Sequence, residues 1–234
     1  CIDLTVTSPP YDSLRLYSGF TFDFNKIADE LYRVTKQGGI VVWVSGDETV
    51  ESRESGTSFK QALYFKEIGF KLHDTMIYEK VNFSMPAKNR YHQIFEYMFV
   101  FSKGKPKTFN PIKDRKNAYA GKTCLGVNSI RKSDGTMQQI ATKKVVTEYG
   151  MRHNIWKMNT AAQERPCQSN VHPAMFPEAL ARDHILSWSN EGTDIVLDPM
   201  AGSFTTCKIA KRLNRNYIGI DISEEYCELG RKRI

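Results

Sequence analysis

The sequence predicts an α/β protein built on a doubly wound parallel sheet, with a basic segment inserted in it. Short apolar runs typical of buried strands alternate with amphipathic segments typical of helices, both before residue 103 and after residue 165. The segment 103–165 between them is polar and basic and shows no strong period. With 234 residues, 41% of them apolar, the chain is long enough to bury one such core.

The elements of this sheet can be placed in chain order. Runs 2–6 and 40–44 are typical of buried strands, and 40–44 is of the parallel type because every position is apolar. Residues 24–34 carry apolar side chains at helical spacing, and this helix is expected to end at Gly38 and Gly39. The remaining elements are expected as a helix at 58–68 closed at Gly69, alternating strands at 70–80 and 94–102 forming an antiparallel far edge, a helix at 173–189, a strand at 195–197, a helix at 207–213, a strand at 217–220, and a last helix capped by Ser223.

The net charge of +7 is concentrated in the middle of the chain. Residues 103–165 hold 14 Lys and Arg against 4 Asp and Glu, whereas the rest of the chain holds 19 against 22. Such an excess in one segment favours binding to a polyanion, and the alternative is a solvated basic loop. The basic residues expected to make such contacts are Lys113, Arg115, Lys116, Lys122, Arg131, Lys132, Lys143 and Lys144.

Composition also excludes several classes of protein. Five cysteines without a CxxC pair favour a reducing compartment and argue against structural zinc. The five histidines form no HExxH pattern, so no metal site is expected. No stretch approaches the roughly 20 apolar residues of a membrane span, and no signal peptide precedes the first strand. These features predict a cytoplasmic protein that does not bind membranes.

The first strand ends in the stiff turn Ser8-Pro9-Pro10-Tyr11. Prolines cannot donate to a sheet ladder, so the strand must stop here. The turn offers a hydroxyl, a carbonyl and an aromatic ring at the carboxyl end of a strand, which is where open α/β sheets bind ligands. On its own this turn is as consistent with an ordinary loop as with a site.

A second candidate site lies in the last forty residues. The segment Asp198–Thr206 joins a strand to a helix, and its small residues and hydroxyls suit close approach to a bound ligand. About twenty residues later Asp221 ends the next strand, a spacing that suits a carboxylate accepting both hydroxyls of a ribose. The segment lacks the GKS/T of a phosphate loop.

Together these residues resemble the S-adenosylmethionine-dependent DNA amino-methyltransferases. Thr7–Tyr11 is similar to their catalytic motif, Asp198–Ser203 to their cofactor loop, and Asp221 to their ribose-binding acid. The segment His172–Glu178 is similar to the one that precedes this loop and lines the methionine end of the cofactor. The catalytic motif comes first and the cofactor motifs last, which is the circularly permuted order of the beta class. The resemblance therefore implies a Rossmann-like sheet, S-adenosyl-L-methionine as the cofactor and double-stranded DNA as the substrate.

The resemblance divides the chain into a catalytic half (1–102), a target-recognition insert (103–165) and a cofactor-binding half of the same domain (166–234). A homodimer and a cognate restriction endonuclease are candidate partners, in a bacterial or phage-encoded system associated with the nucleoid. The cofactor-binding residues that it implies are His172, Pro173, Phe176, Asp198, Pro199, Ala201, Gly202, Ser203, Thr205, Asp221 and Ile222.

Two features depart from the family pattern. Phe204 stands where the cofactor loop often has glycine, so we expect the loop to be less tightly wound there. The family also carries a Gly-Asp strand and a helix before its catalytic strand, whereas this chain opens at Cys1 directly on that strand. We therefore expect that residues preceding Cys1 exist in the natural protein.

In the expected chemistry the Ser8 hydroxyl and the Pro9 carbonyl accept hydrogen bonds from the target amino group, and Tyr11 stacks on the flipped base. Serine at position 8 favours cytosine N4 over adenine N6, because the adenine enzymes more often carry aspartate there. Two alternatives stay open. One is an RNA or protein-glutamine methyltransferase, whose cofactor loop would precede its catalytic motif. The other is a DNA-binding module that has lost catalysis.

Some further residues invite a functional reading. Cys167 lies in a Pro-Cys-Gln sequence like that of cytosine-C5 methyltransferases, but the partner motifs are missing, so we expect no catalytic role. Trp43 and Tyr97 lie in apolar strands and are expected in the core. Trp156 is expected either in the core or as a wall of the cofactor site.

Overall fold

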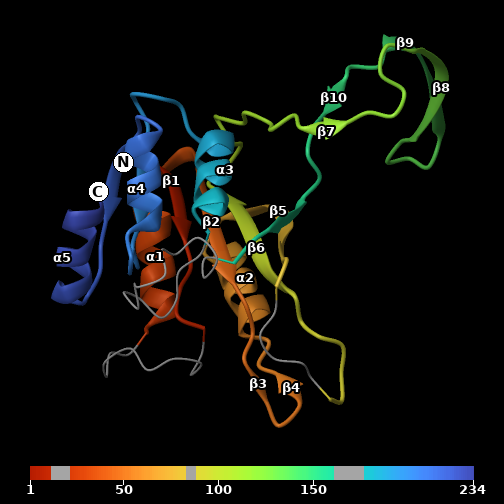
Figure 1. The fold of residues 1–234 in the computed structure, drawn as a ribbon. Helices are drawn as coiled ribbons and strands as arrows, with labels where there is room; N and C mark the ends of the chain where they lie inside the picture. Colours follow the sequence, from red (N-terminus) through yellow and green to blue (C-terminus); the bar gives the residue numbers. More distant parts are fainter. Residues whose placement is uncertain (12–21, 83–87, 161–176) are drawn as a thin grey trace. The chain divides into compact units, whose positions relative to one another are not determined.

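A seven-stranded mixed sheet organises most of the chain (Figure 1). Neighbouring strands are parallel except at β6, which runs antiparallel to both of its neighbours, β2 and β5. The predicted α/β class is confirmed. In spatial order the strands are β11 (Ile155–Met158), β5 (Lys71–Lys80), β6 (Phe95–Ser102), β2 (Thr35–Ser45), β1 (Ile2–Thr7), β12 (Ile195–Asp198) and β13 (Asn216–Gly219).

The computed structural model describes residues 1–11, 22–82, 88–160 and 177–234. Within them the chain divides into a larger unit, Cys1–Asn110 with Asn154–Ile234, and a smaller unit, Pro111–His153. The expected insert, 103–165, is wider than this smaller unit. The first residues of the expected insert, 103–110, belong to the larger unit. The residues from 154 onward also belong to it, and they include β11, a strand of the main sheet.

Helices cover both faces of the main sheet, as a doubly wound arrangement requires. The buried side chains of α1 (Phe24–Val34) and α2 (Thr57–Glu67) pack on one face. Those of α3 (Glu178–Trp188) and α4 (Thr205–Arg212) pack on the other face. A third, smaller cluster lies between α4 and the last helix, α5 (Glu224–Arg233).

Strand β2 shows how one sequence serves both faces. Val41 and Trp43 belong to the cluster under α1 and α2, whereas Val42 and Val44 belong to the cluster under α3 and α4. All four side chains are fully buried, which explains why the run is apolar at every position rather than alternating. Trp43 also donates its indole N–H to Gln61 Oε1 at 2.8 Å, so this buried polar group is satisfied.

The helix ends were predicted unevenly. Ser223 accepts a hydrogen bond from the backbone N–H of Tyr226 at 3.4 Å and begins α5 as expected. The predicted stop of α1 was wrong, because the helix ends at Thr35 and strand β2 begins there. Gly38 and Gly39 lie inside β2, at an irregularity where a β-carbon on Gly39 would stand 3.0 Å from the backbone oxygen of Asp3.

The far edge of the sheet was also predicted incompletely. Strands β5 and β6 pair antiparallel as expected, but the edge is β11, which pairs in parallel with β5. Within β11 the side chains of Trp156 and Met158 are buried, while Ile155 and Lys157 are exposed. This short strand alternates, but four residues are too few to stand out in a polar stretch of sequence.

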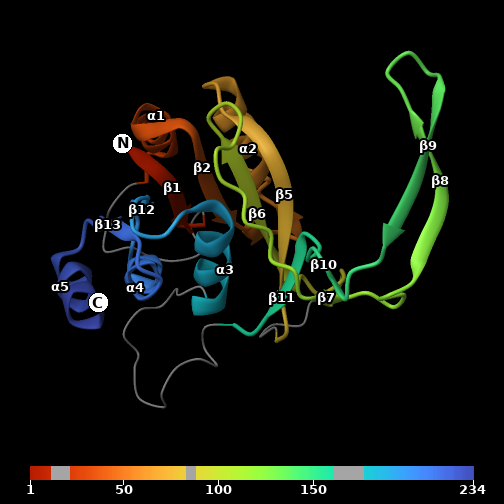
Figure 2. The same ribbon diagram turned by 90° about the horizontal axis from the view of Figure 1, so that it is seen from above.

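The smaller unit is built from two pairs of antiparallel strands. Strand β7 (Arg115–Lys116) pairs with β10 (Tyr149–Gly150), and β8 (Thr123–Arg131) pairs with β9 (Met137–Val145) to form a long two-stranded ribbon (Figure 2). Its turn is closed by a hydrogen bond from Lys132 N to Thr136 O at 2.8 Å. The sequence predicted no strands here, because polar residues occupy most positions.

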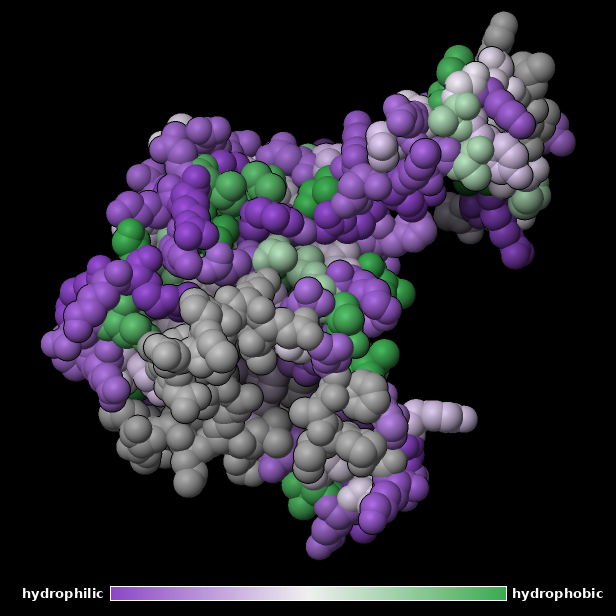
Figure 3. Space-filling model, in the orientation of Figure 1, coloured by the Kyte–Doolittle hydropathy of each residue, from purple (hydrophilic) through white to green (hydrophobic). Residues whose placement is uncertain are grey.

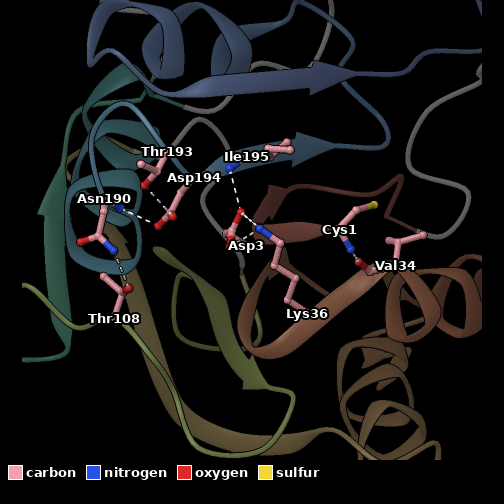
Figure 4. A network of polar contacts seen from close by, with 9 residues as sticks. All are labelled: Cys1, Asp3, Val34, Lys36, Thr108, Asn190, Thr193, Asp194 and Ile195. Carbon is pink, nitrogen blue, oxygen red and sulfur yellow. Dashed lines mark hydrogen bonds and ion pairs between the residues drawn. The ribbon is translucent and has the colours of Figure 1, made fainter.

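At the amino edge of the main sheet, a polar network ties three strands together (Figure 4). The Asp3 carboxylate of β1 accepts hydrogen bonds from Lys36 Nζ of β2 at 2.7 and 2.8 Å. It also accepts one from the backbone N–H of Ile195, the first residue of β12, at 3.0 Å. Asp194 accepts a further bond from Asn190 N at 2.7 Å in the adjoining loop. This network lies at the opposite ends of the strands from the two candidate motifs.

Hydrophilic residues predominate on the face shown in Figure 3, where apolar residues stand in small separate groups.

A short hairpin, β3 (Thr49–Val50) with β4 (Arg53–Glu54), completes the larger unit. Across the described parts of the chain, no helix is both long and apolar enough to cross a lipid bilayer.

Candidate active site

The turn Ser8–Tyr11 follows β1 directly, in the middle of the sheet between β2 and β12. Ser8 Oγ and the Tyr11 hydroxyl oxygen are 2.9 Å apart. The Tyr11 hydroxyl also lies 3.0 Å from Glu96 Oε2 and 3.3 Å from the backbone oxygen of Val44. The side chains of Ser8 and Tyr11 are only partly buried, so both can meet a ligand from solvent.

The ring of Tyr11 lies against the end of β2. A β-carbon on Gly46 would stand 3.5 Å from this ring, which is an ordinary contact distance. Glu96 holds the hydroxyl from the start of β6 and is itself paired with Lys80 Nζ at 2.7 Å. Glu96 was not singled out from the sequence, although an acid inside an otherwise apolar strand was the available signal.

The cofactor-type loop lies at the end of the neighbouring strand β12. Its backbone is folded against β13 by a bond from Ala201 N to Ile220 O at 2.8 Å. Gly202 N donates to Asp221 Oδ2 at 2.7 Å, and Gly202 has the positive φ of 47° that favours glycine. Asp221 Oδ1 accepts a second bond from Ser223 N at 2.9 Å. Asp221 therefore holds the loop in shape through one backbone hydrogen bond to each carboxylate oxygen. Each oxygen can accept more than one hydrogen bond, so the carboxylate can still accept from a ligand.

Phe204 corrects one expectation about this loop. The loop is not relaxed at this position, because Phe204 itself adopts the left-handed conformation, with φ of 59°. Such a conformation costs a non-glycine residue on the order of 1 kcal/mol. Burial of the ring offsets this cost: Phe204 is 7% exposed and packs on Gly219 and Gly230, where a β-carbon would stand 2.5 Å from ring atoms.

Two hydrogen bonds join the two motifs, which are nearly two hundred residues apart in sequence. Thr7 Oγ1, in the residue before Ser8, donates to Asp198 Oδ1 at 2.8 Å. Thr206 Oγ1, at the start of α4, donates to the backbone oxygen of Val6 at 3.1 Å. Both threonines stand in the motifs identified from the sequence, but these contacts between the motifs were not predicted. These two hydrogen bonds connect the turn after β1 to the loop after β12.

Asp198 is almost completely buried, with 1% of its surface exposed. Desolvation by burial raises the pKa of its carboxyl to about 6, although the hydrogen bonds from the Thr7 hydroxyl and the Met200 backbone N–H act in the opposite direction. Nearby, Ser203 Oγ and Thr205 Oγ1 are 3.0 Å apart and both are buried. Ile222, the residue after Asp221, is 69% exposed and offers an apolar surface beside the loop.

The eight predicted basic contacts all lie in the smaller unit. Arg115 Nε donates to the backbone oxygen of Met151 at 3.1 Å, so part of its guanidinium holds the unit together. Lys122 Nζ lies 5.3 Å from the centre of the Tyr119 ring. Lys143 lies outside the residues whose side chains are described, and the other predicted residues are exposed: Lys113, Lys116, Arg131, Lys132 and Lys144.

Other predicted residues fall in different places. His172, Pro173, Phe176 and Cys167 lie outside the described residues. Trp156 is a core residue, 6% exposed, with its ring centre 4.6 Å from that of the buried His184.

Comparison with known proteins identifies the family. The model of the N6/N4 DNA methylase family matches residues 2–232. The orphan methyltransferase M.BamHII of Bacillus amyloliquefaciens is 58% identical over 236 residues, covering 100% of this chain and 88% of the relative.

Two solved structures share the fold. M1.HpyAVI in complex with S-adenosylmethionine superposes with a TM-score of 0.64 at 25% identity, covering 100% of this chain and 89% of that one. The cytosine-N4-specific PvuII DNA methyltransferase superposes with a TM-score of 0.67 at 18% identity, covering 100% and 79%. The family match along almost the whole chain shows that this protein belongs to the N6/N4 DNA methylase family and is a DNA methyltransferase.

Proposed function

We propose that the protein methylates the exocyclic N4 of cytosine in double-stranded DNA, using S-adenosylmethionine as the methyl donor. The observation that carries the choice of cytosine is Ser8, since aspartate is more frequent at this position in enzymes that methylate adenine N6. Adenine N6 is the alternative acceptor. The fold shared with a cytosine-N4-specific enzyme is consistent with both, because structural likeness at 18% identity concerns the fold alone.

The residues of the cofactor-type loop fit S-adenosylmethionine. We assign the ribose hydroxyls to the Asp221 carboxylate, which also accepts from Gly202 N, and the adenine to the exposed apolar side chain of Ile222. Ala201 and Gly202 have little or no side chain, which suits close approach of a ligand to the backbone, and Pro199, Ser203 and Thr205 complete the loop. His172, Pro173 and Phe176 stay predicted for the methionine end. When bound, S-adenosylmethionine supplies an electrophilic methyl group on sulfur.

The catalytic turn then has one main task. The lone pair of an exocyclic amino nitrogen is delocalised into the base, and hydrogen bonds from both amino protons to fixed acceptors favour a tetrahedral nitrogen. We assign these acceptors to Ser8 Oγ and the Pro9 carbonyl oxygen, with Pro10 stiffening the turn. The base must leave the duplex to reach them, and the Tyr11 ring offers it a surface for stacking.

The test compares base products in a host that lacks its own DNA methylation. Expressed there, the protein is expected to produce N4-methylcytosine, and chromatography with mass spectrometry of hydrolysed DNA distinguishes this base from N6-methyladenine. Ser8→Ala should lower turnover at least about tenfold through loss of a hydrogen bond, with binding of S-adenosylmethionine unchanged.

Ser45→Ala is the matched control, because Ser45 ends the adjacent strand β2 and its buried hydroxyl has no hydrogen-bond partner among the described residues. Its turnover should stay within twofold of the wild type. Formation of N6-methyladenine alone would refute the cytosine assignment, and full turnover by Ser8→Ala would refute the role of Ser8.

We further propose that the smaller unit binds DNA through its phosphates. It holds nine lysines and arginines against three acidic residues. Such contacts position the duplex without reading its sequence. The candidate homodimer and restriction endonuclease stay predictions, and so does a bacterial cytoplasmic location.

Replacing Lys143 and Lys144 with Gln should weaken binding to all DNA sequences alike. The slope of log affinity against log salt should fall by about 2, because each lost phosphate contact retains about one more counterion. Fluorescence anisotropy with duplexes of different sequence, over a range of salt, measures both effects. The control replaces Lys60 and Lys66, which are exposed on α2, with Gln, and this variant should bind DNA like the wild type. A loss confined to one sequence would contradict phosphate binding.

A further inference from the structure

We propose that Glu96 is a positioning residue that sets the direction of the Ser8 hydroxyl through Tyr11. This inference rests on the proposed role of Ser8 as an acceptor for the target amino group. Glu96 does not touch the base in this proposal. It acts through a chain of three polar contacts that runs from Lys80 of β5 through Glu96 and Tyr11 to Ser8 in the turn after β1.

The fold brings Glu96 to the site because β6 is antiparallel to its neighbours. The parallel strands β1 and β2 end at the active edge of the sheet, whereas β6 begins there. Glu96 is the second residue of β6, and its side chain is 16% exposed. Lys80, at the end of β5, holds Glu96 Oε1 at 2.7 Å and leaves Oε2 for the Tyr11 hydroxyl at 3.0 Å.

The number of protons fixes the direction of this chain. A carboxylate accepts hydrogen bonds and has no proton to donate, so the single hydroxyl proton of Tyr11 is directed at Glu96. The Tyr11 oxygen can then only accept from Ser8, which lies 2.9 Å away. The Ser8 proton is thereby directed at Tyr11, away from the substrate. The lone pairs of Ser8 Oγ are left to accept from an amino group, as the proposed mechanism requires.

Without the carboxylate this order is lost. In Glu96→Gln the amide oxygen stays with Lys80, and the amide N–H₂ faces Tyr11 and donates to its oxygen. The Tyr11 proton then turns to the backbone oxygen of Val44 at 3.3 Å or to Ser8 Oγ at 2.9 Å, and the Tyr11 oxygen is engaged by the amide. The Ser8 proton is no longer held by Tyr11 and is free to point at the target nitrogen. An amino group that must donate meets a donor instead. The effect is confined to the methyl-transfer step, because no group that binds the cofactor loop has changed.

The experiment measures single-turnover methylation with excess enzyme, using tritiated S-adenosylmethionine and plasmid DNA from a host without DNA methylation. Glu96→Gln is expected to slow the transfer about tenfold, the loss of one charge-assisted hydrogen bond. The dissociation constants for S-adenosylmethionine and for DNA should stay within threefold. Tyr11→Phe keeps the stacking ring but breaks the chain, and it should slow transfer to the same extent.

The double variant separates a chain from two independent contacts. Glu96→Gln in the Tyr11→Phe background should cause no further slowing, because the chain is already broken. Glu79→Gln is the matched control: Glu79 pairs with Lys157 at 2.5 Å across β5 and β11 and touches neither Tyr11 nor Ser8. Its transfer rate should equal that of the wild type, and its melting temperature should match that of Glu96→Gln.

The outcomes distinguish this inference from the proposed function. If Ser8→Ala slows transfer but Glu96→Gln and Tyr11→Phe do not, Glu96 has no positioning role and the proposed role of Ser8 survives. If Ser8→Ala itself transfers at the wild-type rate, the proposed function fails and this inference fails with it. Additive losses in the double variant, or a loss of affinity in place of rate, would also overturn the positioning role.

Discussion

The turn Ser8–Tyr11 and the cofactor-type loop Asp198–Thr206 follow neighbouring strands of one sheet, β1 and β12, yet different interactions hold them. Side-chain hydrogen bonds to Tyr11 hold the turn, and its ring meets Gly46 only at ordinary contact distance. The loop is held by close packing of Phe204 on two glycines and by backbone bonds to Asp221. Hydrogen bonds direct protons, whereas close packing fixes shape. This difference agrees with the proposed roles, in which the turn polarises the target base and the loop fits the cofactor.

Asp198 lies where the catalytic turn and the cofactor-type loop meet. Among the predictions in this comparison, we expect its replacement to have the largest effect on the free energy of unfolding. The folded-state pKa of about 6 lies above the ordinary value of 3.8. At pH values well below 4 the Asp198 carboxyl is protonated in both the folded and the unfolded state, so it does not change the free energy of unfolding. As the pH rises from 4 to 6 only the unfolded chain ionises readily, so the folded state loses stability, by about 3 kcal/mol in full.

Asp198→Asn cannot ionise but keeps an acceptor for Thr7. Relative to this variant, the wild type should lose about 2 kcal/mol of unfolding free energy between pH 4.5 and pH 7. Above pH 7 the difference should stay constant. Urea unfolding of both proteins without cofactor measures it. A difference that does not change with pH would show that Asp198 has an ordinary pKa.

Adding one methyl group tests whether the loop is the more tightly packed half. In Gly219→Ala the new carbon would stand 2.5 Å from the Phe204 ring and 2.6 Å from Cys207 Sγ. Such overpacking should lower the free energy of unfolding by about 1–3 kcal/mol. Gly46→Ala places the same methyl 3.5 Å from the Tyr11 ring and should cost less than about 1 kcal/mol. Equal losses in urea unfolding would remove the contrast between the two halves.

The sequence predicted those parts of the fold where local pattern and tertiary environment agree. Ser223 was recognised as a cap because its hydroxyl acts on its own helix, and the run 40–44 because both of its faces are buried. The ribbon of β8 and β9 was missed because exposed strands need no apolar alternation. The glycines of β2 were misread as a helix stop, since a close approach to Asp3 is a tertiary constraint that no local pattern carries.

The candidate site divides in the same way. Ser8, Asp198 and Asp221 stand in recognisable motifs, so resemblance to a family located them. The contact of Thr7 with Asp198 and the role of Glu96 were missed because the partners lie far apart in sequence, by 191 residues for Thr7 and 85 for Glu96. Only the sheet order, with β6 reversed beside β2, brings an acid from the middle of the chain to the first turn.

The packing of Phe204 also constrains how this loop can change during evolution. The ring fills the volume that side chains at 219 and 230 would otherwise occupy, so the three positions form one steric unit. A relative with glycine at 204 has room for a larger residue at 219 or 230, and a lineage that kept the phenylalanine must keep both glycines. Substitutions at these positions should therefore covary, although they lie in a loop, a strand and a helix.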